Sequence, residues 1–236
     1  MKIVFTNAPR NRARFAASQP IAVVFTCLIL CLVAQLAFAT TKGLNQIVTP
    51  DIQPEGQLSI SYQQQDPRIG NSSQIQAELG ITNNFEVAVF QGMSPGTQVL
   101  NAEYGIIQKT PYLLSTGFLG WSDAGTQASP FLEGGYYKGP YQLSLGAIEA
   151  PETRPSGVVS NDAYTIEAIL GFAYKADPRM QYQVDYQTGT GNSATAGFTY
   201  ALTPSLSFNP AVYMSNDSGH KLMGYGVLTY TITAFK

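Results

Sequence analysis

Charged side chains are scarce in this sequence. Asp, Glu, Lys and Arg make up only 12% of its 236 residues, against about a quarter in an ordinary soluble domain. The 13 Lys and Arg do not outnumber the 15 Asp and Glu, and they form no basic cluster. The composition therefore disfavours a domain with a well-solvated charged surface, and it argues against nucleic acid as a partner.

Cysteine and histidine are also nearly missing. The two cysteines, Cys27 and Cys31, both lie in an apolar N-terminal run, and the only histidine is His220. The rest of the chain therefore has neither a disulfide framework nor a thiolate metal site. We expect no metal and no cofactor.

One long apolar run is present, from Ile21 to Leu36. Arg10, Arg12 and Arg14 precede it, and residues 37–39 (Ala-Phe-Ala) place small side chains where a signal peptidase reads them. This pattern predicts a cleavable secretory signal peptide over residues 1–39; an uncleaved membrane anchor is the alternative. Cleavage would remove four of the 13 basic residues and none of the 15 acidic ones, leaving 197 residues with a net charge near −6.

After residue 56 no segment has a helical apolar period of useful length, and apolar residues instead alternate with polar ones. Tyr182, Val184 and Tyr186, for example, alternate with Gln183 and Asp185. Such alternation predicts antiparallel β-strands with one apolar and one polar face. We predict twelve strands, at 57–65, 73–82, 85–91, 98–108, 112–121, 130–138, 141–149, 163–175, 180–188, 193–202, 205–214 and 221–235.

The connections between these strands alternate strictly between short and long. Tight turns on one side and longer loops on the other are typical of an up-and-down barrel in the bacterial outer membrane, which also requires an even number of strands. The predicted fold class is therefore all-β: an up-and-down antiparallel transmembrane β-barrel of about twelve strands over residues 57–236. Residues 40–56 are predicted to be a periplasmic lead-in, extended and loosely held.

A secreted β-sandwich or soluble β-barrel would show the same alternation, but its solvent face would carry many Lys and Glu residues. Aromatic placement also favours the membrane barrel, because rings at both strand ends suit the headgroup level. Rings near the short turns are Phe85, Tyr112, Tyr137, Tyr141, Tyr174, Tyr200 and Tyr230; those near the long loops are Tyr62, Phe90, Trp121, Phe131, Tyr164, Tyr186 and Tyr213. As lipid-facing girdle residues we select Phe85, Tyr141, Tyr174, Tyr186, Tyr200 and Tyr230. The facing of 112–121 stays open, because Leu113 and Leu114 are adjacent.

Acidic residues occupy the polar face of several strands. The predicted lumen-facing set is Glu78, Glu86, Glu103, Glu133, Glu167 and Asp185. Twelve tilted strands leave an opening on the order of 12 Å, which small inward residues would keep open (Gly80, Ala88, Gly105, Gly171 and Gly197). Because inward acids favour cations, the sequence predicts a channel or transporter-like barrel that passes small solutes. A structural or adhesive barrel with a closed lumen is the alternative.

The signal peptide, the strand Gly56–Tyr62, the Leu202–Leu206 turn and the aromatic near the C-terminus resemble bacterial outer-membrane β-barrels. Among these the chain is most similar to the outer-membrane transporter family linked to phenol-degradation pathways. The resemblance implies a location in the outer membrane, with lipid bilayer, lipopolysaccharide and the barrel-assembly machinery as partners. One feature departs from the pattern: Phe235 is followed by Lys236 and is out of phase with Tyr230 and Ile232, which leaves the assembly signal open.

His220 shares a predicted loop with Ser215, Asp217 and Ser218, which are the residue types of a serine hydrolase. A working triad needs the base held against the nucleophile beside an oxyanion site, and a flexible Asn-Asp-Ser-Gly-His loop offers no such rigidity. We therefore predict no catalytic residue and no enzyme, with a lipid-acting barrel enzyme as a distant alternative.

Overall fold

The computed structural model describes residues 43–93, 96–122, 128–153 and 159–235, and for residues 152–153 and 159–163 only the backbone. The predicted signal peptide over residues 1–39 lies outside these ranges. Every regular element within them is a β-strand. In this described part no helix is long and apolar enough to cross a membrane.

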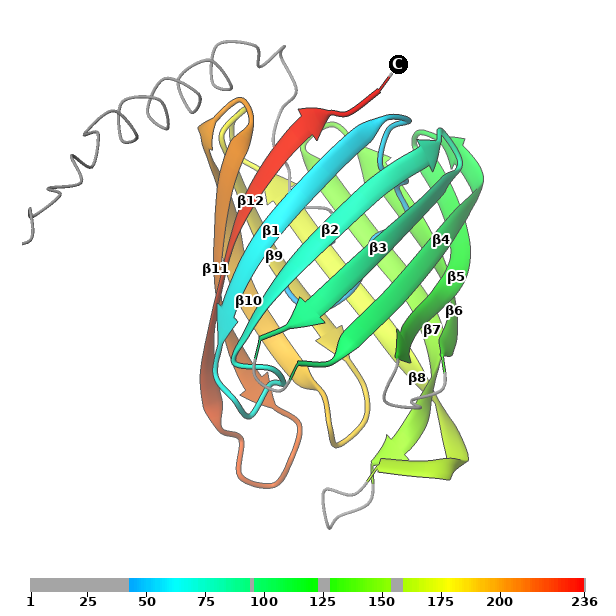
Figure 1. Cartoon of the computed structure of the whole chain (residues 1–236), viewed down its shortest axis with the longest axis vertical. Helices are drawn as coiled ribbons and strands as arrows, with labels where there is room; N and C mark the ends of the chain where they lie inside the picture. Colours follow the sequence, from blue (N-terminus) through cyan, green and yellow to red (C-terminus); the bar gives the residue numbers. More distant parts are fainter. Residues whose placement is uncertain (1–42, 94–95, 123–127, 154–158, 236) are drawn as a thin grey trace, which may run out of the picture. The chain divides into compact units, whose positions relative to one another are not determined.

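Twelve strands form one closed barrel (Figure 1). Each strand pairs antiparallel with its neighbours in the chain, and β12 pairs back onto β1, for example Ile60 with Tyr230. The predicted all-β up-and-down barrel is confirmed. The strands are β1 (Gln57–Gln65), β2 (Ser73–Thr82), β3 (Phe85–Gly92), β4 (Gln98–Lys109), β5 (Tyr112–Ser122), β6 (Ser129–Lys138), β7 (Tyr141–Thr153), β8 (Val159–Lys175), β9 (Met180–Gln187), β10 (Ser193–Thr203), β11 (Leu206–Ser215) and β12 (Leu222–Thr233).

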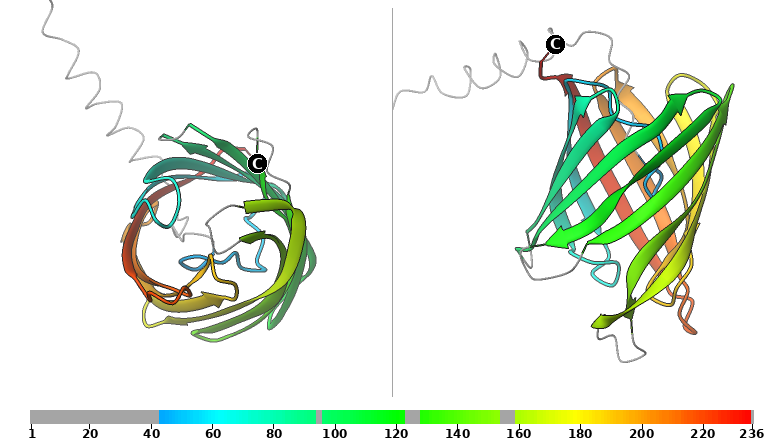
Figure 2. Two further views of the ribbon diagram at one scale, coloured as in Figure 1. Left: turned by 90° about the horizontal axis from the view of Figure 1, so that it is seen from below. Right: turned by 90° about the vertical axis from the view of Figure 1, so that its right-hand side faces the viewer.

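Short turns and long loops lie at opposite ends of the barrel, as predicted. The turn end also holds the start of β1 and the end of β12 (Figure 1). The predicted loop 150–162 is too long, because β7 continues to Thr153 and β8 already begins at Val159. These two strands remain paired beyond a β-bulge at Pro151/Glu152, and they extend past the rim of the neighbouring strands (Figure 2).

Most apolar side chains of the strands face outward. Leu170, Val184 and Leu228 are 43%, 48% and 41% exposed, whereas Glu103 and Asp185 are each only 4% exposed. A soluble β-sandwich would show the reverse, with its leucines and valines in a dry interior. The barrel therefore presents hydrocarbon to its surroundings and encloses polar groups.

β-Bulges shift the facing of two neighbouring strands. The register between β4 and β5 slips between Gly105 and Ile107, so Ile106 and Ile107 are both exposed and Gln108 turns inward. Of the two adjacent leucines on β5, Leu113 is the buried one, which settles the facing that the sequence left open.

Residues 43–56 run inside the barrel. Seen along the barrel axis, this segment crosses the interior of the ring (Figure 2). Leu44, Asn45, Ile47, Ile52 and Gln53 in it are buried. The prediction that the lead-in is loosely held is wrong, because its polar and apolar side chains both find partners on the inner wall.

Where this segment joins β1, Gly56 has a φ of +73°, and a Cβ on it would overlap the carbonyl oxygen of Phe235. The main chain of Ala234 donates a hydrogen bond to the carbonyl of Gly56 (2.6 Å), so the two ends of the barrel meet at this residue. We expect Gly56→Ala to lower the free energy of unfolding by about 1–3 kcal/mol. Gly224→Ala is the matched control, because nothing lies within 4 Å of its Cβ position. Denaturant titration of the barrel in detergent measures both, and equal midpoints would contradict this account.

Candidate functional site

The described part of the lead-in, residues 43–56, begins with a tight turn. The N–H of Leu44 donates to the carbonyl of Ile47 (3.0 Å), and the N–H of Gly43 donates to Oγ1 of Thr49 (3.2 Å). Gly43 adopts a φ of +84°, which a residue without a Cβ reaches at little cost. We call residues 43–49 the turn segment.

A carboxylate on the wall binds the backbone of this turn. Asp185 of β9 accepts hydrogen bonds from the N–H of Asn45 (2.8 Å) and from the N–H of Gln46 (3.2 Å). Two successive N–H groups aimed at one carboxylate form a small anion-binding concavity. Asp185, which the sequence predicted to face the lumen, therefore binds the chain's own lead-in.

The side chain of Asn45 is bound as fully as its backbone. Its Nδ2 donates to Oγ1 of Thr195 (3.0 Å) and weakly to the carbonyl of Gln183 (3.4 Å). Its Oδ1 accepts from Nε2 of Gln183 (2.9 Å) and Nδ2 of Asn209 (3.3 Å), and its carbonyl accepts from the hydroxyl of Tyr213. Every polar group of this asparagine thus has a partner, contributed by β9, β10 and β11.

The turn segment also has an apolar side. Leu44 and Ile47 are buried in a cluster with inward residues of β6, β7 and β8, namely Phe131, Ile148, Ile169 and Ala173. An apolar patch inside an otherwise polar lumen would be costly to leave in water. It provides a dry seat for the turn segment.

A second set of contacts holds residues 50–53 of the lead-in, nearer to the short turns. The N–H of Gln53 donates to Oε2 of Glu86 (2.5 Å), and its Nε2 donates to Oγ of Ser59 (2.7 Å). On the other side, Nε2 of Gln108 donates to the carbonyl of Pro50 (2.7 Å) and the hydroxyl of Tyr137 donates to Asp51 (2.8 Å). This second set of contacts therefore spans the wall from β1 to β6.

Several inward glycines face this segment rather than open water. A Cβ on Gly80 would overlap the carbonyl oxygens of Gln53 and Pro54, and one on Gly171 would overlap Cδ1 of Leu44. Gly197 approaches Oδ1 of Asn45 in the same way. The sequence interpretation, that small inward residues keep the bore open, is wrong at these positions: they make room for the chain.

The six predicted lumen acids all lie on the inner face and are buried: Glu78, Glu86, Glu103, Glu133, Glu167 and Asp185. They do not form one ring. Glu86 and Glu103 are paired across β3 and β4, whereas Glu167 accepts hydrogen bonds from Gln187 (2.7 Å) and Asn192 (2.8 Å). The acids are therefore spread over the inner wall: Glu78, Glu86 and Glu103 line one cavity, and Glu167 lies in a separate hydrogen-bonded setting.

A cavity of about 500 Å³ lies in the lumen above the turn segment, on the side of the long loops. Its lining is mixed: amide and charged side chains alternate with apolar ones, among them Leu44, Ile69 and Leu119. The lining includes Gln63, Gln65, Gln74, Gln76, Asn101, Asn192, Phe90, Tyr213, Tyr225, Glu78, Glu86, Glu103, Arg68 and Lys221. The turn segment forms part of the wall of this chamber.

At the loop end the β1–β2 connection folds over the barrel mouth. Ile69 packs against the inward residues Tyr213 and Met223. Beside it Nε and Nη2 of Arg68 donate to the carboxylate of Asp66 (2.8 and 2.6 Å), and these hydrogen bonds lower the pKa of Asp66 to about 2. The pair therefore stays ionised through the neutral range, and its contribution to stability is lost as the pH falls from the ordinary carboxyl pKa of 3.8 through about 2.

The β11–β12 loop contains no hydrolase arrangement. Ser215 donates its hydroxyl to Asp217 (2.9 Å) rather than to His220, and this hydrogen bond is the main reason why the pKa of Asp217 is lowered. His220 is exposed, and its Nδ1 lies 3.4 Å from the carbonyl of Ser215. In the described residues no group of three or more His, Cys, Asp or Glu side chains could hold a metal ion.

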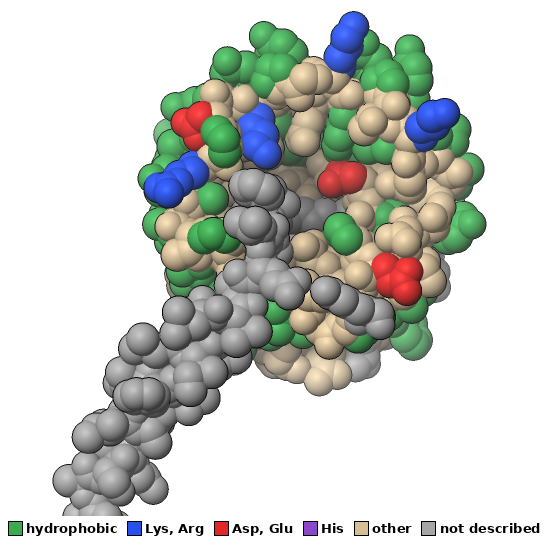
Figure 3. Space-filling model, turned by 90° about the horizontal axis from the view of Figure 1, so that it is seen from above, with side chains coloured by type: hydrophobic (Ala, Val, Ile, Leu, Met, Phe, Trp, Pro, Cys, Tyr) green, Lys and Arg blue, Asp and Glu red, His purple; other side chains and the backbone are tan. Residues whose placement is uncertain are grey.

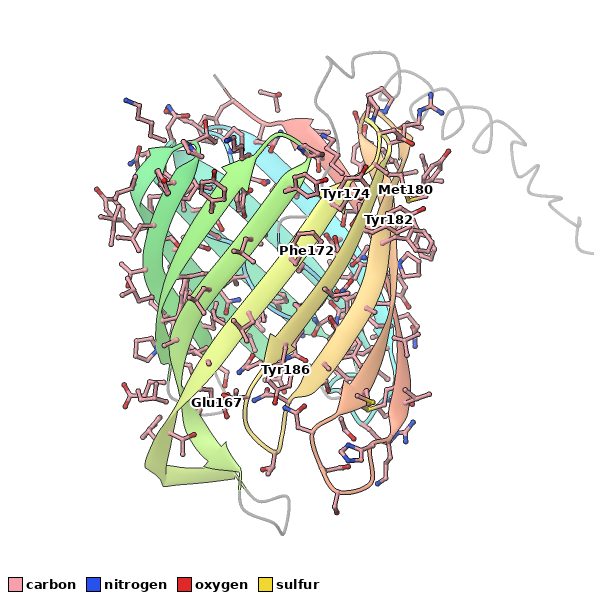
Figure 4. All side chains as sticks on the ribbon, turned by 180° about the vertical axis from the view of Figure 1, so that it is seen from behind. Glu167, Phe172, Tyr174, Met180, Tyr182 and Tyr186 are labelled. Atoms are coloured by element: carbon pink, nitrogen blue, oxygen red, sulfur yellow. The ribbon has the colours of Figure 1, made fainter. Side chains whose placement is uncertain are left out.

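The six selected girdle aromatics all lie on the outer face. Tyr141, Tyr174 and Tyr186 are exposed, and Phe85, Tyr200 and Tyr230 are half-buried. Tyr174 and Tyr182 lie toward the short turns and Tyr186 toward the long loops (Figure 4). Other rings in the wider set face the lumen, which corrects the prediction for Phe90, Phe131, Tyr137 and Tyr213. Strand alternation, rather than nearness to a strand end, decides the facing of each ring.

Sequence reasoning missed Asn45, Gln53, Gln183, Asn209 and Tyr213 as site residues. One signal was present: Phe131, Ile148, Ile169 and Ala173 are in phase with inward acids and serines, so they mark an apolar patch on a wet wall. Such a patch requires a cover, although the sequence does not say which segment supplies it.

No model of a known protein family matches this chain, and no curated protein matches it. Solved structures do. The KdgM porin, solved in complex with disordered oligogalacturonate, superposes with a TM-score of 0.50 at 12% identity, covering 74% of this chain and 98% of KdgM. The fold is that of an outer-membrane porin.

Two other matches are weaker. The NanC porin superposes with a TM-score of 0.48 at 9% identity over 73% of this chain and 98% of NanC. Outer membrane phospholipase A from Escherichia coli superposes with a TM-score of 0.43 at 12% identity, covering 83% of this chain and 100% of the phospholipase. Neither score carries an argument about activity. The resemblance to the family linked to phenol degradation stays a prediction, because no family model matches.

Proposed function

We propose that the protein is an outer-membrane channel that passes small solutes. The observation that carries this proposal is the chamber of about 500 Å³, lined in part by amide and carboxylate side chains, inside a closed barrel whose outer surface is apolar. A barrel that served only as a rigid anchor would need no water-accommodating interior lined by amide side chains.

The charges in the lumen support a preference for cations. Glu78, Glu86 and Glu103 line the chamber, against Arg68 and Lys221 near the loops. Arg68 is already paired with Asp66, so the deeper part of the chamber is acidic. Acidic linings favour cations over anions in channels.

The partners follow from the same surfaces. The outward apolar band and its aromatic rings suit a bilayer with lipopolysaccharide in its outer leaflet. At the turn end, basic side chains stand on the rim of the ring (Figure 3). Secretion through a signal peptide over residues 1–39 and insertion by the barrel-assembly machinery, with Phe235 as part of the signal, complete the proposal.

A second candidate is a structural barrel with a closed lumen. The turn segment favours it, because Leu44, Asn45 and Ile47 are buried against the wall in the middle of the lumen. A lipid-acting enzyme has no comparable support, since Ser215, Asp217 and His220 do not form a triad.

Planar-bilayer recording on residues 40–236 separates the two candidates. A channel is expected to give discrete openings and to pass K⁺ more readily than Cl⁻. Heat-modifiable gel mobility shows that the sample is a folded barrel. A folded sample that gives no openings, even after removal of residues 40–52, would support the closed structural barrel.

A further inference from the structure

We propose that the inner wall formed by β6 to β11 is a peptide-binding site, that residues 43–49 are its built-in ligand, and that this turn segment closes the channel while it is bound. The inference rests on the proposed channel function. It adds that the turn segment acts as the gate of this channel, and that the inner wall binds it as a peptide ligand.

The wall forms hydrogen bonds with all the polar groups of Asn45, so its contacts are specific for an asparagine side chain. Asn45 uses both atoms of its side-chain amide, its N–H and its carbonyl, each with a wall partner that has the opposite hydrogen-bonding role. An alanine at this position would leave Thr195, Gln183 and Asn209 without these bonds. Amide–amide pairing of this kind is specific, because an acid or a hydrocarbon cannot satisfy the same groups.

Apolar seats on both sides of the asparagine complete the site. Leu44 and Ile47 flank it in the sequence, and both enter the cluster formed by Phe131, Ile148, Ile169 and Ala173. The ligand chemistry is therefore a short peptide with an asparagine between apolar side chains, held in a tight turn. The carboxylate of Asp185 accepts hydrogen bonds from the two backbone N–H groups at the tip of this turn.

The mode of attachment lets the segment leave. The turn segment adds no strand to the barrel; among the described residues 43–56 the one ladder-like contact is an isolated bridge between Glu55 and Gly80. Cleavage after residue 39 would leave the segment tethered at Gly56 alone. Most of the polar wall groups that it covers, among them Asp185 and Thr195, can be hydrated once it departs, because water fills an open lumen of this kind.

Bound, the segment blocks passage at two levels. The turn segment lies against the β6–β11 side of the lumen, and residues 50–53 cross from Gln108 and Tyr137 to Glu86 nearer the short turns. The chamber on the loop side remains. A solute can thus enter the chamber from the loop end, but it meets the segment before it reaches the turn end.

The experiment compares planar-bilayer currents of the chain 40–236 with those of a chain that lacks residues 40–52. Loss of the segment is expected to raise the mean current about tenfold or more, since several buried hydrogen bonds hold the closed form. A synthetic peptide of residues 40–52 should then block the shortened chain. The same peptide with Asn45→Ala should block about tenfold less well.

Full-length substitutions guard against misfolding of the shortened chain. Asn45→Ala should open the channel, whereas Gln46→Ala should not, because Gln46 contributes its backbone N–H to Asp185 and its side chain makes only a long 3.5 Å contact to Gln187. Equal, non-zero currents from the full and shortened chains would overturn the gate while leaving the channel intact. Silence from both folded chains would overturn the channel itself. Current that the peptide does not reduce would overturn the binding site.

Discussion

Val184→Arg is expected to destabilise the barrel by about 2–4 kcal/mol when it folds into lipid vesicles. Val184 lies in the middle of the eight-residue strand β9, faces outward and is 48% exposed. If hydrocarbon surrounds this surface, the guanidinium must leave water at the depth where the penalty is greatest. Denaturant titration of vesicle-inserted protein gives the free energy of folding.

The control is an arginine at an outward-facing position near the edge of the bilayer. Ile81 has the same outward facing but lies one residue from the end of β2, beside the Asn83–Asn84 turn. Ile81→Arg should cost only about 0–1 kcal/mol, because a long side chain at the interface reaches water. If the two arginines cost the same, the outer face is not in a bilayer.

The second large effect concerns ion selectivity. Changing Glu78, Glu86 and Glu103 together to glutamine should lower the K⁺ to Cl⁻ permeability ratio from several-fold to about one. All three carboxylates line the chamber, and glutamine retains their size and one acceptor oxygen. The shortened chain without residues 40–52 is the background in which the currents are large enough to compare.

Reversal potentials in a KCl gradient measure this ratio. Glu55→Gln is the matched control, because Glu55 is exposed outside the lumen lining and contacts Asn83. An unchanged ratio in the triple variant would show that the inward acids do not set selectivity. A smaller conductance with an unchanged ratio would point to a structural role for these carboxylates.

Alternation predicted the barrel well because a strand has a period of two, and each residue's facing is therefore readable from its neighbours. The facing of Val184 and Asp185 follows directly. Alternation gave the wrong facing where the period of two breaks. The β-bulge between Gly105 and Ile107 exposes two isoleucines in a row and turns Gln108 inward. Bulges insert a residue without changing composition, so the sequence alone gives no sign of them.

Aromatic residues were harder to place than aliphatic ones. The outer rings Tyr141 and Tyr174 share the apolar phase of their strands. Tyr137 and Tyr213 do not: their rings pack inside while their hydroxyls bond the lead-in. A tyrosine has an apolar body and a polar tip, so it fits either face. The hydrogen-bond acceptor of its hydroxyl, here a residue of the distant lead-in, decides which face the ring takes.

The sequence by itself determined the twelve-stranded antiparallel barrel, its short and long ends, its apolar outside and the inward facing of its acids, because these properties depend on local alternation and on turn length. Only the tertiary structure decided that residues 43–56 occupy the lumen. That placement depends on contacts such as Asn45 with Asp185, separated by 140 residues, and no local pattern encodes a pairing over that distance.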